Sequence, residues 1–169
     1  MKAPNNEFLQ IDRTFHELGL EEGADDESRM YQLLGERNAF HWADLLKEHR
    51  VILLSEAGSG KTAEIRNVAR KLRGEGKPAF FVRIEHVTQD FEDAFEEGTY
   101  EDFTVWASSG QEGWLFLDSV DEARLRGPGD FEIAIKKLSR RLKAVLQPAH
   151  IVITSRATAW RAKTDLYLC

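Results

Sequence analysis

Short apolar runs recur along the chain, and segments with helical periodicity separate them. Four runs rich in Val, Ile, Leu or Phe predict buried strands, at residues 51–54, 79–85, 113–118 and 151–154. Strands that are apolar along their whole length are typical of parallel sheets, because helices cover both faces of such a sheet. The pattern therefore predicts strands that are buried rather than half-exposed.

The segments between these runs predict helices. Apolar residues recur at three- and four-residue spacing within residues 61–74, and most regularly within residues 130–146, where Pro148 follows as a stop. Weaker helical patterns occupy residues 31–46 and 90–109. This alternation of strands and helices predicts an α/β fold, in which a parallel sheet lies between two layers of helices.

The N-terminal segment differs from the rest of the chain. Residues 21–28 read EEGADDES and are too polar to be buried, so they predict a solvated loop or linker. The remaining residues fall within the size range of one domain. We therefore divide the chain into a lead segment, residues 1–35, and a core, residues 36–169.

Charge and residue usage exclude several classes of function. The net charge of -6 argues against a protein whose main task is to wrap nucleic acid. The single Cys169 cannot form an internal disulfide, and the histidines show no metal-ligand spacing. Neither an apolar run of about 18 residues nor a signal peptide is present, so we expect a cytoplasmic location and no membrane partner.

Residues 55–62 read S-E-A-G-S-G-K-T and match the phosphate-binding pattern G-x-x-x-x-G-K-S/T except at Ser55, which replaces the first glycine. In such a loop the glycines let backbone N–H groups close around phosphate oxygens, at the positive end of the following helix. Lys61 would contact the β- and γ-phosphates, and the Thr62 hydroxyl would bind magnesium. The alternative is a glycine-rich turn that only joins a strand to a helix. The predicted nucleotide-binding residues are Ala57, Gly58, Ser59, Gly60, Lys61, Thr62 and Ala63.

Asp118 ends the apolar run of residues 113–118 and is a candidate second magnesium ligand. Phosphate-binding loops need a carboxylate from a neighbouring strand to complete the coordination of the metal. Ligands of α/β sheets bind at the carboxyl ends of the strands, where this side chain would lie. The alternative is a helix-capping Asp in a surface turn. Together with Thr62, Asp118 predicts a site for Mg²⁺ and ATP.

The residues after Asp118 indicate which family of phosphate-binding proteins the chain resembles. Residues 118–122 read D-S-V-D-E, and residues 151–156 form an apolar run that ends in Thr-Ser-Arg. With the phosphate loop, these motifs resemble the NACHT group of STAND P-loop ATPases, over roughly residues 50–160. The resemblance implies a three-layer P-loop NTPase fold with about five parallel strands, in which residues 151–154 lie between residues 51–54 and 113–118.

The resemblance also implies roles and partners. Arg156 would face the γ-phosphate, and Asp121 or Glu122 would polarise the attacking water. The alternatives are an acidic first turn of the next helix for the two acids, and a surface ion pair for Arg156. Members of the group continue into a lid, a winged helix and a sensor region, so we expect a truncated core; the alternative is a free-standing reduced version. The full-length protein would self-associate and act as an ATP-driven switch with slow hydrolysis.

Two other functions stay open from the sequence alone. A small-molecule phosphotransferase would need an arginine-rich lid, for which residues 124–129 are the candidate. The other alternative is a catalytically silent nucleotide-binding scaffold.

Two further sequence features are not assigned to the site. Residues 162–165 read A-K-T-D but lack the Asn of the guanine-reading motif. The basic run within residues 136–143 is interpreted as a solvated helix face.

Overall fold

The computed structural model describes residues 13–17, 39–118, 120–126, 129–143, 145 and 147–165. Its contacts divide the chain into two units, Met1–Leu45 and Leu46–Cys169. In the first unit, Phe15 and Phe40 form an antiparallel bridge, and helix α2 spans Trp42–Leu45. The acidic stretch of residues 21–28 lies outside the described residues.

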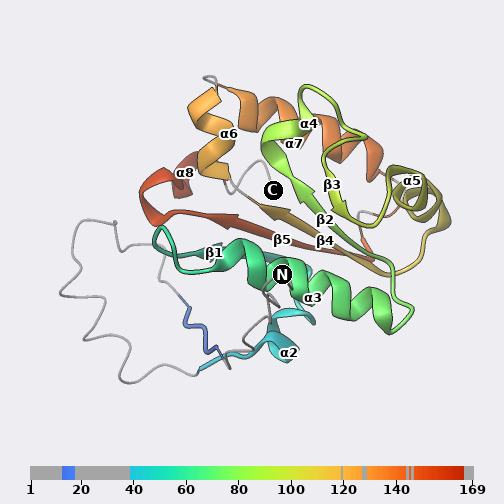
Figure 1. Ribbon diagram of the computed structural model, residues 1–169, viewed down its shortest axis with the longest axis horizontal. Coiled ribbons are helices and arrows are strands. Elements are labelled where there is room, and N and C mark those ends of the chain that lie inside the picture. Colours follow the sequence, from blue (N-terminus) through green and yellow to red (C-terminus); the bar gives the residue numbers. More distant parts are fainter. Residues whose placement is uncertain are drawn as a thin grey trace, which may run out of the picture. The chain divides into compact units, whose positions relative to one another are not determined.

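The second unit contains a five-stranded sheet in the order β1-β5-β4-β2-β3 (Figure 1). The strands span Arg50–Leu54 (β1), Ala79–Arg83 (β2), Phe95–Glu97 (β3), Gly113–Asp118 (β4) and Ala149–Ser155 (β5). Strands β1, β5, β4 and β2 run parallel, so their carboxyl ends meet at one edge. Strand β5 lies between β1 and β4, which confirms the strand order that the motifs implied.

Strand β3, which no apolar run predicted, corrects two predictions. Strand β3 lies inside the segment for which the sequence predicted only helical structure, and it pairs antiparallel with β2, so the sheet is mostly rather than wholly parallel. Strand β2 ends at Arg83, because the chain turns there into the short helix α4, Ile84–Val87. The apolar residues of α4 are buried like those of a strand, which is why the pattern did not separate the two elements.

Five further helices follow the predicted alternation or extend it. They span Lys61–Gly74 (α3), Tyr100–Ser109 (α5), Val120–Arg126 (α6), Asp130–Arg141 (α7) and Ala162–Asp165 (α8), and a 3₁₀ turn (η1) spans Ala157–Ala159. Helix α7 ends several residues before the predicted limit. Among the described helices, none is both long and apolar enough to cross a bilayer.

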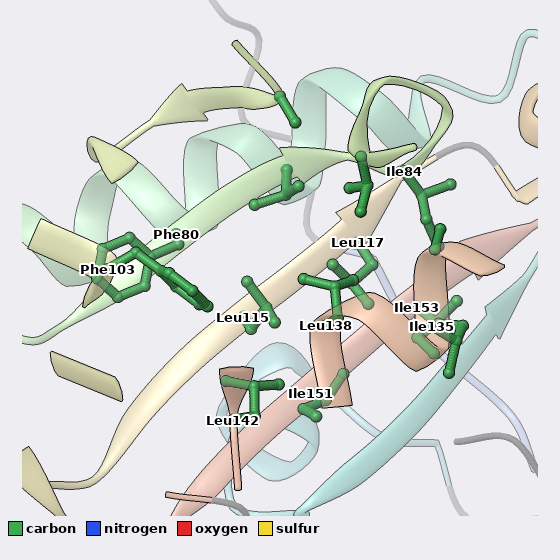
Figure 2. Packing of buried hydrophobic residues seen from close by; sticks show 14 of the residues in the cluster. Phe80, Ile84, Phe103, Leu115, Leu117, Ile135, Leu138, Leu142, Ile151 and Ile153 are labelled. Atoms are coloured by element: carbon green, nitrogen blue, oxygen red, sulfur yellow. The ribbon is translucent and has the colours of Figure 1, made fainter. Parts of the chain in front are cut away.

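Helices cover both faces of the sheet. On one face, side chains of α4, α5, α6 and α7 pack with alternate residues of β2, β4 and β5, among them Phe80, Leu115 and Ile153 (Figure 2). The residues between these point to the other face, where α3 packs and its Arg66 guanidinium lies over the ring of Phe81. This two-sided burial explains why the strands read as continuous apolar runs.

Candidate phosphate and magnesium site

The loop between β1 and α3 has the backbone that its glycines predict. Gly58 and Gly60 have φ angles of 74° and 82°, in the left-handed region that L side chains rarely adopt. Gly60 is also the N-cap of α3, and no side chain caps the helix there. The N–H groups of the first helical turn, with the positive end of the helix dipole, therefore face the loop, as anion binding requires.

Ser55, the residue that departs from the phosphate-binding pattern, has a structural role in this loop. Its hydroxyl lies 2.9 Å from the hydroxyl of Ser59, so a hydrogen bond joins the beginning of the loop to its apex. Its backbone N–H donates to the carbonyl of Ser155 at 3.2 Å, which continues the β1–β5 ladder by one residue. The substitution of glycine by serine is therefore accommodated without breaking the loop.

Lys61 folds back over the loop. Its Nζ donates to the carbonyl oxygens of Ser55 and Glu56, at 3.2 and 3.0 Å. These contacts place the positive charge beside the loop rather than in open solvent. An anion held by the loop would therefore lie next to this ammonium group.

Asp118 connects the loop to the centre of the sheet. This carboxylate is 1% exposed; its Oδ2 accepts from the Thr62 hydroxyl at 2.6 Å, and its Oδ1 accepts from the Thr154 hydroxyl. Three elements, α3, β4 and β5, thus contribute to one buried network. The buried position in this network excludes the alternative of a capping Asp in a surface turn.

The residue types around Asp118 fit Mg²⁺. In the part of the chain that the structure describes, no three His, Cys, Asp or Glu side chains gather into a metal cage. Magnesium bound with nucleotides does not need such a cage, because phosphates and waters supply most of its oxygen ligands. One hydroxyl and one carboxylate in contact, Thr62 and Asp118, match the protein's share of that coordination.

The acids that follow β4 lie in the first turn of α6. Asp121 is largely buried, and its Oδ2 accepts from Nε of Arg156 at 2.7 Å. The structure therefore joins two of the three predicted catalytic residues in an ion pair. For Glu122 it describes the backbone only, within α6. Asp121 therefore has the position in the first turn of a helix that was named as the alternative for the two acids. Arg156 forms an ion pair, as its own alternative stated.

Comparison with known proteins does not identify a family for this chain. No protein-family model matches the chain, and no curated protein matches it. The interpretation of the site depends on its motifs and contacts.

Three side chains noted in the sequence have other roles in the structure. Arg124, from the candidate lid, donates to Asp165 Oδ1 at 2.6 Å and lies over the ring of Phe131. Asp165, which resembles a guanine-reading residue, is 1% exposed and also accepts from the backbone N–H of Arg161. Arg124 and Asp165 are therefore partners in a buried ion pair. Lys137, in the basic run, donates to the carbonyl of Val87 instead of pointing into solvent.

Sequence reasoning did not assign the hydroxyl of Thr154 to Asp118. Thr154 is a polar residue in an apolar strand and is fully buried. A buried hydroxyl needs a partner. In a parallel sheet whose register is known, the neighbouring strand shows where that partner lies: Leu117 pairs with Ile153, so Asp118 lies opposite Thr154.

Proposed function

We propose that this domain binds Mg²⁺-ATP at the carboxyl edge of the sheet. The observation that carries the proposal is the hydrogen bond of 2.6 Å between Thr62 and Asp118. It joins the first turn after the glycine loop to the strand end where a second metal ligand is needed. A loop that only linked β1 to α3 would not require a buried carboxylate at that position.

Each group of the site has a distinct task in this proposal. The N–H groups of the loop and of the first turn of α3 surround the phosphate oxygens, and Lys61 neutralises their charge. Thr62 and Asp118 hold the metal, which neutralises charge on the β- and γ-phosphates when bound. Thr154 fixes the orientation of the Asp118 carboxylate. An acid in the first turn of α6 orients the attacking water.

The resemblance of the motifs extends the proposal to a switch. In a larger protein, binding of ATP would favour one conformation or oligomeric state, and slow hydrolysis would reset it. This part of the proposal depends on the three motifs alone. The isolated domain is expected to turn over slowly, because such sites are commonly completed by residues from a lid or from a neighbouring subunit.

Calorimetric titration of the 169-residue chain with Mg²⁺-ATP tests the proposal. Lys61→Ala should weaken binding about 10- to 100-fold, because a charge-assisted hydrogen bond contributes about 1.5–3 kcal/mol. Lys71→Ala is the matched control, since this exposed lysine lies in the same helix, about 15 Å further along it. Equal affinities for the wild type and Lys61→Ala would refute nucleotide binding at this loop.

A further inference from the structure

Ser55, the residue that replaces the first glycine of the pattern, lies where three parts of the molecule meet. Its backbone N–H donates to the carbonyl of Ser155 at the end of β5, and its own carbonyl accepts from Nζ of Lys61. Its hydroxyl lies 2.9 Å from the hydroxyl of Ser59. This one residue therefore connects the sheet, the apex of the glycine loop and the first residue of α3.

The pair of hydroxyls spans the part of the loop with the greatest backbone freedom. Ser59 is partly buried, and the residues on either side of it, Gly58 and Gly60, are exposed and have left-handed φ angles. Glycine loses more conformational freedom than any other residue when its backbone is fixed. Ordering the loop around phosphate oxygens therefore costs entropy. A bond across the loop that forms beforehand reduces this cost.

The end of the bond at Ser55 is anchored. The preceding residue, Leu54, pairs with Ser155 in the β1–β5 ladder, and Ser155 is fully buried. The N–H of Ser55 continues this ladder by one hydrogen bond of 3.2 Å. Because one hydroxyl is fixed to the sheet, the bond restrains the other one, at Ser59. Two hydroxyls that both lay in unanchored loops would give no such restraint.

We propose that Ser55 and Ser59 form a hydroxyl clamp, which holds the glycine loop in its phosphate-binding shape and raises the affinity for nucleotide. The inference rests on the proposed function, because the clamp acts on a loop that binds phosphate. Ser55 is then a positioning residue, which acts through the loop backbone and leaves the phosphate contacts to the N–H groups and the lysine. The departure from the phosphate-binding pattern is in this case favourable: glycine at position 55 would remove the clamp and add backbone freedom.

The test is a double-mutant cycle on the 169-residue chain, with Ser55→Ala, Ser59→Ala and the double variant. Calorimetry gives the affinity of each protein for Mg²⁺-ATP. Ser55→Ala should weaken binding about two- to tenfold, the equivalent of one hydrogen bond between neutral groups. In the Ser59→Ala background the same substitution should have little further effect, because the bond can be lost only once.

Three more variants separate the clamp from a general loss of stability. Ser55→Thr keeps the hydroxyl and should bind Mg²⁺-ATP like the wild type. Ser55→Gly restores the usual residue of the pattern and should nevertheless bind at least as weakly as Ser55→Ala. Ser139→Ala is the matched control, because the Ser139 hydroxyl donates to a backbone carbonyl within α7, and it should leave the affinity unchanged. Urea unfolding of the same proteins records changes in stability, which alone do not alter the affinity of the folded domain.

The contrary results are distinct. If Ser55→Ala weakened binding by the same factor in the wild-type and Ser59→Ala backgrounds, the two hydroxyls would act independently and the clamp would be overturned. Unchanged or tighter binding by Ser55→Ala or Ser55→Gly would also overturn it. Failure of the wild type to bind Mg²⁺-ATP would overturn the proposed function as well, and this outcome is recognised without any variant.

Discussion

Replacement of Thr154 by valine tests the buried network around Asp118. The substitution keeps the shape of the side chain and removes the hydroxyl that donates to Asp118 Oδ1. Asp118 is 1% exposed, so water does not replace the lost donor. A buried acceptor left without a partner costs about 1–3 kcal/mol, and a charged one more. We therefore expect the free energy of unfolding to fall by about 2–3 kcal/mol.

Urea unfolding followed by circular dichroism measures this loss, and thermal unfolding should show a decrease in Tm of about 4–12 °C for a domain of this size. Thr154→Ser keeps the hydroxyl and should recover most of the loss. Thr104→Val is the matched control, because the Thr104 hydroxyl donates to the carbonyl of Tyr100 on an exposed face of α5.

The same variants test the proposed metal site. With Asp118 no longer oriented, Thr154→Val should need a higher Mg²⁺ concentration for half-maximal ATP binding, whereas binding without Mg²⁺ should change little. The reasoning would be refuted if Thr154→Val were as stable as Thr104→Val, or if Thr154→Ser were as unstable as Thr154→Val. Either result would mean that the hydroxyl does not support the carboxylate.

Two further substitutions test the loop backbone and the second ion pair. Gly60→Ala should lose about 1–2 kcal/mol of stability because φ is 82°, whereas Gly74→Ala, with open space around it and an ordinary φ, should be neutral or stabilising; chemical denaturation compares them. Arg124→Ala should cost about 3–5 kcal/mol, since it removes the cationic partner of the buried Asp165 carboxylate. Arg70→Ala, which breaks an exposed pair, should cost less than about 1 kcal/mol by the same assay.

The sequence predicted the parallel part of the sheet well because burial on both faces leaves a strong signal. Strands β1, β4 and β5 coincide with apolar runs, within one or two residues at each end. Strand β3 was missed because it has only three residues, Phe95–Glu97, and two of them are glutamates. Such a short edge strand depends on its partner β2 for its conformation, and local propensity does not reveal it.

The site was predictable where its residues follow an apolar strand in the chain. The glycine loop and Asp118 were found because each ends or follows an apolar strand. The ion pair between Arg124 and Asp165 was missed, because its members lie 41 residues apart and nothing in the sequence couples them. The pairing of Arg156 with Asp121 likewise depends on the adjacency of β4 and β5 in space.

The position of β1 has a consequence for how the site is assembled during folding. In the described part of the sheet, β1 pairs with β5 alone, and its first residue, Arg50, lies opposite Ile151. Most of the domain, residues 51–150, therefore lies between these partners, and the glycine loop acquires its place beside Asp118 only when this long-range pairing forms. Closing so long a loop costs entropy before any contact repays it. If the loop binds nucleotide as proposed, it would do so only in chains that have formed this pairing, and by mass action the nucleotide would stabilise the finished sheet over every partly folded form.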